Sequence, residues 1–371
     1  MAIKKSALYG AIWKSCDELR GGMDASQYKD YVLVILFLKY ISDKQKADPD
    51  SMLNEIPEGC TFDDVVKLKN KSGIGEAINT RLEKIAKAFG LGDGFFNNAD
   101  FDNEDKLGKG KDLIDTVSNL IEVFENPALD FGKNRTADDD LIGDAYEYLM
   151  RNFASQSGKS KGQFYTPAEA SRLAAQLLDI GNDDRPKISI YDMTCGSGSL
   201  LLRAGAESKA QATFLFGQEK DVVTLNMARM NMILHGMDGY ADLCLGDTLN
   251  SPAHLESGEH LEGFNYCVAN PPFSIKSWMK SARPKDAYGR WDATDEHVGI
   301  PPKGKADLAF LLHLVRSLDS KGRGACFLPH GVLFRGSVEK KQDEAIVRKN
   351  LIKKHLSSTY KCNFLGADNK Q

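Results

Sequence analysis

The segment FNYCVANPPF, residues 264–273, decides the fold class of this chain. Its first part, Phe264 to Ala269, is an apolar run that predicts a buried parallel strand. The tetrapeptide Asn270-Pro271-Pro272-Phe273 follows at the carboxyl end of that strand, where open α/β sheets bind their ligands. The Asn270 amide and the Pro271 carbonyl are two acceptors on a turn that the prolines stiffen, and Phe273 offers a face for stacking. The segment predicts a receptor for a planar group that carries an –NH2, with a plain strand-terminating turn as the alternative.

A Gly-rich turn lies upstream of this segment. The apolar, β-branched run Ile188 to Tyr191 leads into Asp192-Met193-Thr194-Cys195-Gly196-Ser197-Gly198-Ser199, and an apolar helix start follows at Leu200. The two glycines allow a ligand to approach the backbone closely, and the helix start presents N–H groups that have no partner within the helix. Leu201 stands where the dinucleotide fingerprint G-x-G-x-x-G has its third glycine. The turn therefore predicts a ligand site less strongly than the full fingerprint would.

An acidic residue ends each of three successive predicted strands. Asp192 ends the first, Glu219 follows the strand predicted over 214–217, and Asp247 follows the one over 241–245. Glu219 comes about twenty residues after the glycines, the spacing at which an acid binds ribose hydroxyls. Asp247 could accept from an adenine amino group. Each acid alone is more often a helix cap, but three on one sheet edge favour a nucleoside site.

The segment GQFYTPAE, residues 162–169, predicts a well-made helix start. Thr166 is the N-cap, Pro167 the first helical residue and Glu169 the third, which together make a capping box. The N–H groups at this start and the Thr166 hydroxyl could also hold a carboxylate, such as the amino-acid end of a cofactor.

In combination these motifs resemble the S-adenosylmethionine-dependent amino-methyltransferases of DNA. Their order, GQFYTP, DMTCGSGS, QE, GD and NPPF, is similar to that of the modification (M) subunits of type I restriction–modification systems, which methylate adenine at N6. The stretch from Ile12 to Asp43 also resembles the helical leader of those subunits, and the resemblance extends to about Lys354.

The resemblance implies S-adenosylmethionine as cofactor and double-stranded DNA as substrate. It also implies a specificity (S) subunit and a second modification subunit as partners, with the restriction subunit as a further candidate. The implied catalytic residues, which would receive a flipped adenine, are Asn270, Pro271, Pro272 and Phe273. The implied cofactor-binding residues are Gln163, Phe164, Tyr165, Thr166, Pro167, Asp192, Gly196, Ser197, Gly198, Ser199, Glu219 for the ribose and Asp247 for the adenine.

Periodicity divides the chain into a helical part and an α/β part. Before the polar stretch 155–162, apolar residues recur at spacings of three and four, which predicts helices over 6–20, 28–42, 76–89, 112–124 and 140–152. After it, strands predicted at 188, 214, 241, 264 and 324–328 alternate with helices over 167–179, 199–208, 221–235 and 306–319. We therefore expect a helical bundle over 1–155, a linker over 156–162, and a doubly wound, mostly parallel Rossmann-like methyltransferase sheet over 163–371.

Composition agrees with a globular cytoplasmic protein. The chain has 371 residues, no signal pattern at its start, and no apolar run long enough to span a bilayer. Its 7 cysteines show neither C-x-x-C nor zinc-finger spacing, so no metal site is expected. The formal net charge is −4, from 48 basic and 52 acidic residues, which is unfavourable for holding DNA without a partner.

The stretch 274–306 is too long for a simple connection. It contains Trp278 and Trp291 among basic residues, a combination that predicts exposed aromatic side chains that stack on nucleic acid. The alternative is a solvated insertion. The basic residues are Lys276, Lys280, Arg283, Lys285, Arg290, Lys303 and Lys305.

The tail after Lys354 departs from the family pattern, because no strand followed by a Gly-rich hairpin is recognisable there. We therefore expect a chain that is truncated or frame-shifted at its C-terminus. Three alternatives to an active adenine methyltransferase subunit stay open at this point: a non-catalytic remnant that keeps the cofactor fold, a protein-glutamine methyltransferase, and a nicotinamide-dependent Rossmann enzyme. The long leader and the GQFYTP segment argue against the protein-glutamine methyltransferase. The NPPF motif and the absence of the third glycine argue against the nicotinamide-dependent enzyme.

Overall fold

The computed structural model describes residues 9–10, 13–14, 25–49, 55–133, 148, 166, 168–273, 275–279, 286–291, 299–336 and 343–356. The chain forms two compact units, one made of residues 1–161 with 229–239 and the other of residues 162–228 with 240–371. The linker predicted over 156–162 lies outside the described residues, so the predicted domain boundaries stay a prediction.

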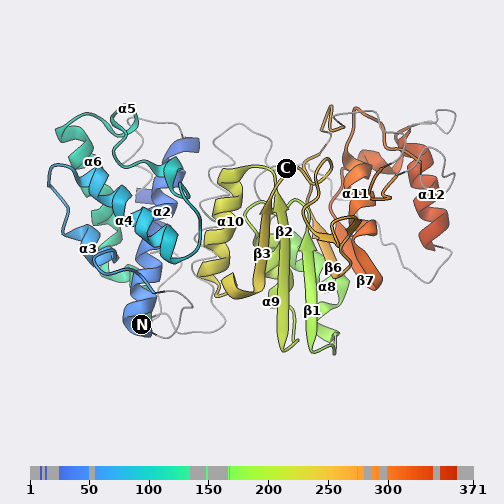
Figure 1. The fold of residues 1–371 in the computed structure, drawn as a ribbon, viewed down its shortest axis with the longest axis horizontal. Coiled ribbons are helices and arrows are strands. Elements are labelled where there is room, and N and C mark those ends of the chain that lie inside the picture. Colours follow the sequence, from blue (N-terminus) through green and yellow to red (C-terminus); the bar gives the residue numbers. More distant parts are fainter. Residues whose placement is uncertain are drawn as a thin grey trace. The chain divides into compact units, whose positions relative to one another are not determined.

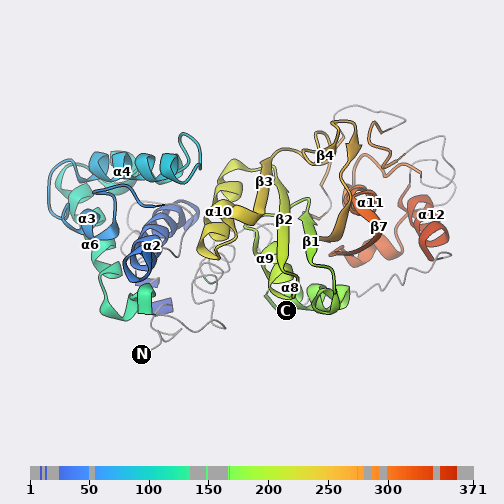
Figure 2. The same ribbon diagram turned by 60° about the horizontal axis from the view of Figure 1, so that its bottom comes forward.

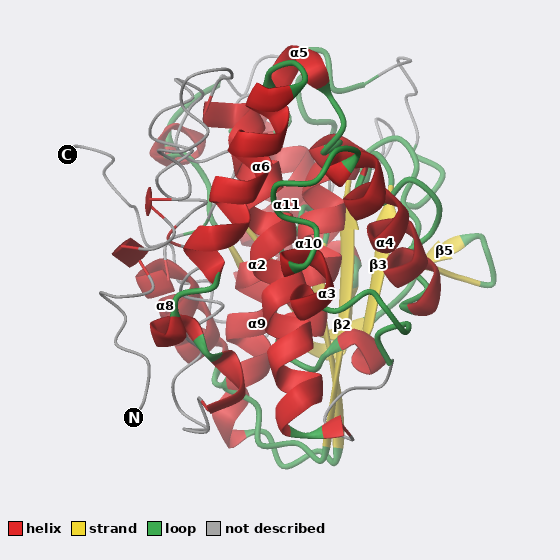
Figure 3. Ribbon diagram, turned by 90° about the vertical axis from the view of Figure 1, so that its left-hand side faces the viewer, coloured by secondary structure: helices red, strands yellow, loops and turns green. Residues whose placement is uncertain are grey.

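The described residues of the first unit form helices and the loops that connect them, without a strand (Figure 3). Its longest helices arise where the sequence shows apolar spacings of three and four, as expected from 28–42, 76–89 and 112–124. Its helices are α2 Ala25–Ala47, α3 Phe62–Val66, α4 Ile74–Ala88, α5 Glu104–Leu107 and α6 Lys111–Phe124, with single 3-10 turns η2 Asn97–Ala99, η3 Pro127–Leu129 and η4 Phe131–Lys133. The helical bundle predicted for the leader is confirmed, while most of the helices predicted over 6–20 and 140–152 lies outside the described residues.

Helix α2 forms the centre of this first unit because it is apolar on every side from Tyr31 to Leu38, all of which are buried. Tyr31 donates to the Asp100 carbonyl at 3.0 Å and meets the Phe101 ring edge-on, so the chain around Asp100 is held against α2. A helix that is buried all round needs covering on all sides, and α6 and the short turn η4 pack against it.

The second unit contains a five-stranded parallel sheet in the order β3-β2-β1-β6-β7 (Figure 1). Its strands are β1 Lys187–Asp192, β2 Ala212–Glu219, β3 Ala241–Leu245, β6 Phe264–Ala269 and β7 Leu318–Cys326, and a small hairpin joins β4 Leu255–Glu256 to β5 His260–Leu261. Its helices are α8 Ala168–Leu178, α9 Ser199–Ala206, α11 Asp307–Arg316 and α12 Glu344–Leu356, with 3-10 turns η5 Ile180–Asn182 and η7 His330–Leu333. Helix α10 Val222–Leu234 and the 3-10 turn η6 Asp238–Tyr240 each have residues in both units, because residues 229–239 belong to the first.

The strand order reverses between β1 and β6, which pair in parallel with Ile190 opposite Tyr266 and Tyr191 opposite Cys267. From β1 the chain moves outward through α9 to β2, and from β6 it moves in the opposite direction through α11 to β7. Right-handed crossovers in opposite directions place their helices on opposite faces, so the sheet is doubly wound. Helices α8 and α9 lie side by side and α9 packs on β1 and β2 (Figure 2), while α11 packs on β6 and β7. The predicted doubly wound sheet is confirmed.

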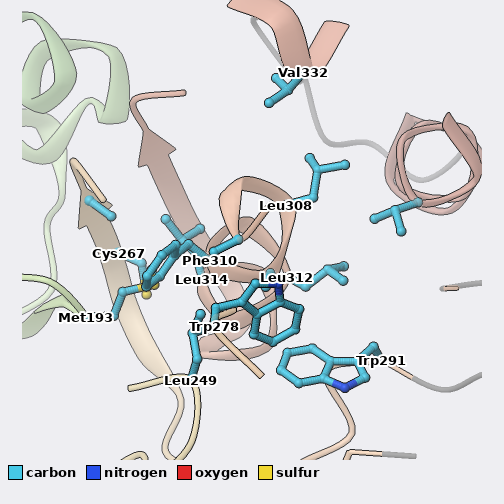
Figure 4. Close-up of a cluster of buried hydrophobic side chains, with 14 of the residues drawn as sticks. Met193, Leu249, Cys267, Trp278, Trp291, Leu308, Phe310, Leu312, Leu314 and Val332 are labelled. Carbon is cyan, nitrogen blue, oxygen red and sulfur yellow. The ribbon is translucent and has the colours of Figure 1, made fainter. Parts of the chain in front are cut away.

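The tryptophans of the 274–306 stretch are buried, so the prediction that they stack on nucleic acid is wrong. Trp278 is 6% exposed and Trp291 is 4% exposed, and their rings meet edge-to-face with centroids 5.2 Å apart. Figure 4 shows both indoles among the side chains of α11, near Leu249 and Leu312. Indole rings bury a large apolar area, and here they anchor the stretch to the core of the second unit.

Candidate active site

The Gly-rich turn has the tight geometry that its sequence predicts. Gly196 and Gly198 have φ angles of 56° and 78°, in the left-handed region that glycine adopts without a Cβ penalty. A Cβ built on Gly196 would approach only the Thr194 carbonyl, at 3.9 Å, so the space beside it is open. Gly198 is the N-cap residue of α9, which leaves the first N–H groups of that helix at the carboxyl edge of the sheet, where an anion or hydroxyl is favoured.

Glu219 connects the Gly-rich turn to the end of β2. Its Oε2 accepts from the Gly196 amide at 3.1 Å, and its Oε1 accepts from the amides of Lys220 and Asp221 at 2.8 and 2.9 Å. Burial raises the pKa of this carboxyl group, against the lowering effect of these three amides. Each carboxylate oxygen has a second lone pair, so the group can still accept from neighbouring hydroxyls, as a ribose diol requires.

Asp247, beyond the end of β3, already receives a charged donor. Lys220 Nζ lies 2.8 Å from Asp247 Oδ2, and the lysine side chain is 73% exposed. The other oxygen, Oδ1, accepts from the amides of Leu249 and Asn250. Burial would raise the pKa of Asp247, but Lys220 and Asn250 together lower it. An exposed ammonium is easily displaced, so Oδ2 is suited to accept from another amine, such as that of an adenine.

Asp192 is the most buried of the three acids, at 1% exposure. Its Oδ1 accepts from the Thr194 amide at 2.9 Å. Burial raises the pKa of Asp192 to about 7, with the Glu219 carboxylate adding to the increase and the Thr194 amide opposing it. A buried acid whose pKa is shifted so far, at the carboxyl edge of a sheet, is typical of a functional site.

We expect Asp192→Asn to stabilise the ligand-free chain at pH 8 and not at pH 4. Below the pKa of the unfolded chain, which is near 4, Asp192 is neutral in both the folded and the unfolded state and does not lower the free energy of unfolding. As the pH rises towards 7, the unfolded chain loses the proton while the folded one keeps it, so the wild type loses stability that the variant retains. The variant should gain about 1–3 kcal/mol in denaturant unfolding at pH 8. An equal effect at both pH values would show that the charge is not the cause.

The amide of Asn270 is oriented by a residue far away in the sequence. Its Nδ2 donates to Thr166 Oγ1 at 3.1 Å, across 104 residues. With the NH2 group used in this way, Oδ1 is left to accept. The sequence predicted a role for each residue separately, Thr166 as a helix cap and Asn270 as an acceptor. Helix α8 begins at Ala168, directly beyond the Thr-Pro pair.

The rest of the tetrapeptide leads from the core to the surface. Pro271 is buried, Pro272 is half-buried and Phe273 is exposed at 38%. The carbonyl of Ala269 accepts from the Phe327 amide at 2.9 Å, so the chain leaving β7 is fixed beside the tetrapeptide. That chain reaches η7 and Phe334, which is 67% exposed. Sequence analysis did not single out this exposed ring, whose only signal is its position after a predicted strand.

Four of the residues implied by the resemblance, Gln163, Phe164, Tyr165 and Pro167, lie outside the described residues. The others gather at one edge of the second unit: Asp192, Glu219 and Asp247 at the ends of three neighbouring strands, and Asn270 beyond β6. Ser197, in the Gly-rich turn, and Ser199, the first residue of α9, have their hydroxyls 3.0 Å apart. The edge spans the point at which the strand order reverses, where doubly wound sheets bind their ligands.

A buried charge network fastens the 274–306 stretch to the loop after Asp247. Arg290, 3% exposed, donates to both oxygens of Asp286 and to the carbonyls of Thr248 and Leu249. It also approaches His313, whose pKa is held well below its usual value by burial and by the Arg290 charge. Arg290 is therefore used inside the fold, which corrects its place among the basic residues expected to face DNA.

Comparison with known proteins identifies the family. A model of the N-6 DNA methylases matches residues 137–359, and a model of the N-terminal domain of the HsdM proteins matches residues 8–124. The chain belongs to the N-6 DNA methylase family. The match covers more than half of the chain and includes every described residue of the candidate site.

Relatives of this N-6 DNA methylase are methylase subunits of type I restriction enzymes. It is 32% identical to the MpnII methylase subunit of Mycoplasma pneumoniae, over 92% of this chain and 71% of that protein. It is 28% identical to the EcoKI methylase subunit of Escherichia coli, over 89% of this chain and 59% of that protein. The crystal structure of a type I methyltransferase subunit from Streptococcus thermophilus is similar with a TM-score of 0.77 and 32% identity, over 94% of this chain and 79% of that one.

These findings confirm two predictions. The predicted family is that of the modification subunits, and the predicted enzyme class is that of the adenine-specific DNA methyltransferases that depend on S-adenosylmethionine. The findings do not favour the protein-glutamine and nicotinamide alternatives, since both matched models belong to DNA methylases. No described helix is long and apolar enough to cross a membrane.

Proposed function

We propose that this chain transfers a methyl group from S-adenosylmethionine to the exocyclic amine of adenine in DNA, as the cytoplasmic modification subunit of a type I restriction–modification complex. The observation that carries the proposal is the Asn270 amide, which Thr166 holds at the point where the strand order reverses. An acceptor fixed at that point can orient an amine, and the acids on the neighbouring strands can hold a nucleoside cofactor next to it.

The residues present fit S-adenosylmethionine, which would supply the methyl group on its sulfonium. Glu219 would accept from the ribose hydroxyls, and Asp247 would accept from the adenine amine in place of Lys220. The turn with Gly196 and Gly198 would pass close to the ligand backbone, and Ser197 and Ser199 would offer hydroxyls. Thr166, which lies just before α8, would face the amino-acid end.

The proposed chemistry at the target is mainly positioning. An adenine inside a duplex cannot expose its amine, so the base has to be flipped out of the stack. Asn270 Oδ1 and the Pro271 carbonyl would accept the two amine hydrogens, which directs the nitrogen lone pair to the methyl group. Phe273, which is 38% exposed, would stack on the base. The proton leaves after the nitrogen has become cationic, so no general base is required beforehand.

Sequence specificity would come from a partner. The formal net charge of −4 gives this chain little attraction for phosphates, and Arg290 is paired inside the fold. Reading a sequence requires side chains that reach base edges, usually from an element in the major groove. The described residues after the sheet form η7 and α12. A specificity subunit bound to two modification subunits would supply both the element that recognises the DNA sequence and most of the affinity for DNA.

We therefore expect no sequence-specific methylation of DNA by the isolated chain, and specific adenine methylation when the specificity subunit of its own system is added. Transfer of a labelled methyl group to DNA, with and without that subunit, measures this directly. A DNA that lacks the target sequence serves as the control.

Specific methylation by the isolated chain would contradict the proposed need for a partner. Binding of S-adenosylmethionine without transfer, even with the specificity subunit present, would instead favour the non-catalytic remnant. Absence of cofactor binding would contradict the cofactor assignment itself.

A further inference from the structure

Three metal-ligand side chains meet at the edge strand β3, and none of them is among the proposed methyl-transfer residues. Asp242 and Cys244 are two residues apart on this strand, so their side chains leave the same face. His254 comes from the segment that follows Asp247. One ligand atom from each residue, a carboxylate oxygen, Sγ and a ring nitrogen, lies within 4.8 Å of the other two.

The hydrogen bond made by His254 determines which ring nitrogen faces this cluster. Nε2 lies 3.0 Å from the Gly217 carbonyl oxygen, which can only accept, so Nε2 carries the hydrogen. In the neutral ring Nδ1 then presents a lone pair, and it points towards Asp242 Oδ2 at 3.8 Å. Two acceptors that face each other repel unless a cation lies between them. A metal-bound histidine commonly donates its other N–H to a backbone carbonyl in this way.

Two of the spacings within this cluster are close to those of a tetrahedral site. Zinc binds nitrogen and oxygen at about 2.0–2.2 Å and sulfur at about 2.3 Å, which places tetrahedral ligands roughly 3.3–3.7 Å apart. The distance between Nδ1 of His254 and the nearer Asp242 oxygen is 3.8 Å, and Cys244 Sγ is 3.7 Å from the other oxygen. All three ligand atoms lie within 4.8 Å of one another, and the Asp242 side chain, 62% exposed, can move to bring them to tetrahedral spacing.

We propose that Asp242, Cys244 and His254 bind a divalent transition-metal ion, zinc in particular, with solvent as the fourth ligand. A thiolate with an imidazole selects zinc-like ions over magnesium or calcium, which prefer oxygen. The site carries no recognisable sequence signal, because D-x-C followed by a histidine ten positions later is not a zinc-finger spacing.

The ion would act by fastening a loop to the sheet. His254 belongs to the segment after Asp247, and its ring packs edge-on against Tyr191, Phe216 and Phe264. Gln218 already holds the same segment through the Ser251 carbonyl and the Ala253 amide. A metal bound to two residues of β3 and one of this segment would add a cross-link, so binding should stabilise the second unit.

The test uses the full chain without an affinity tag, stripped with a chelator and titrated with zinc against a chromogenic indicator. We expect one equivalent bound by the wild type, and an affinity at least about 100-fold lower in Asp242→Asn and Cys244→Ala. Saturating zinc should raise the melting temperature of the wild type by a few degrees and leave that of both variants unchanged. Cobalt(II) should give the intense near-ultraviolet absorption of a thiolate complex, which Cys244→Ala should lose.

Glu256→Gln is the matched control, because it removes an exposed carboxylate from the neighbouring strand β4 and leaves all three ligands in place. It should bind zinc as the wild type does. The proposal is overturned if the wild type binds no stoichiometric zinc at micromolar concentration, which would leave His254 and Asp242 as an ion pair. It is also overturned if either ligand variant binds zinc as tightly as the control. Neither result bears on the methyltransferase assignment.

Discussion

Gly198→Asp should abolish the binding of S-adenosylmethionine to this chain. Gly198 is the N-cap residue of α9 with φ 78° and ψ −1°, and its amide is already used in a bond to the Cys195 carbonyl. An aspartate would place a side chain in the turn where the ligand backbone is expected, and its charge would repel the carboxylate of the ligand. Calorimetry should show an affinity at least about 100-fold lower, or about 2.7 kcal/mol.

The control for backbone strain is Gly236→Asp. Gly236 has a similar φ of 65°, and a Cβ built on it meets nothing within 4 Å, so this variant carries the left-handed penalty without blocking the turn. It should bind the cofactor normally. Gly198→Ala separates size from charge and should bind with intermediate affinity. If folded Gly198→Asp protein bound as tightly as the wild type, the cofactor would not occupy this turn.

The sequence predicted the five main strands because each is a short apolar run that ends in a turn signal. The strand at 264–269 matches β6 residue for residue, and the ones at 188–191 and 214–217 lie inside β1 and β2. Parallel strands are buried on both faces, so their apolar runs stand out in the sequence. For the same reason the sequence also predicted where these strands end, and therefore which residues follow them at the sheet edge: Asp192, Glu219, Asp247 and Asn270.

The strand β7 shows where this signal weakens. It was predicted over 324–328 and runs from Leu318 to Cys326, while the helix before it ends at Arg316 and not at residue 319. Its first half, LDSKGR, is polar and contains a glycine, because it lies at the edge of the described sheet and pairs only with β6. The register also shifts between Phe264 and Tyr266. Tertiary pairing, not local preference, makes this segment a strand.

Short elements gave no periodic signal. Helices α3 and α5 have 5 and 4 residues, and the strands of the β4–β5 hairpin have 2 each, so none completes two periods of its pattern. Helix α12, EAIVRKNLIKKHL, has 13 residues but was not predicted, since its apolar and basic residues are not separated into two faces.

The errors at the candidate site come from side-chain burial. A tryptophan beside lysines has the same sequence whether it faces DNA or the core, and Trp278 and Trp291 both lie in the core. Arg290 is likewise basic in the sequence but neutralised by Asp286 in the fold. Arg290 and Asp286 are only four residues apart. The contacts of Arg290 with the Thr248 and Leu249 carbonyls, however, join separate segments, and neither spacing nor composition predicts such contacts.

The contact between Thr166 and Asn270 is another such pairing, and it makes Asn270 a sharp test of the methyl-transfer proposal. Asn270→Ala should lower methyl transfer by roughly two to three orders of magnitude, as expected when one preorganised hydrogen-bond partner of the reacting group is removed. Among the described residues, the Asn270 side chain makes one hydrogen bond, to Thr166 at 3.1 Å, so the free energy of unfolding should fall by no more than about 1 kcal/mol. Single-turnover transfer, measured with the specificity subunit present, gives the rate.

Asn270→Asp is the informative control for this experiment. A carboxylate keeps an oxygen that accepts from the adenine amine but cannot donate to Thr166 as the amide does. It should therefore be more active than Asn270→Ala and less active than the wild type, while all three proteins bind S-adenosylmethionine with similar affinity. Because the cofactor would be held by the ends of β1, β2 and β3, substitutions at Asn270 should change methyl transfer without changing cofactor binding. A folded Asn270→Ala protein that methylates DNA at the wild-type rate would show that the tetrapeptide does not hold the target amine.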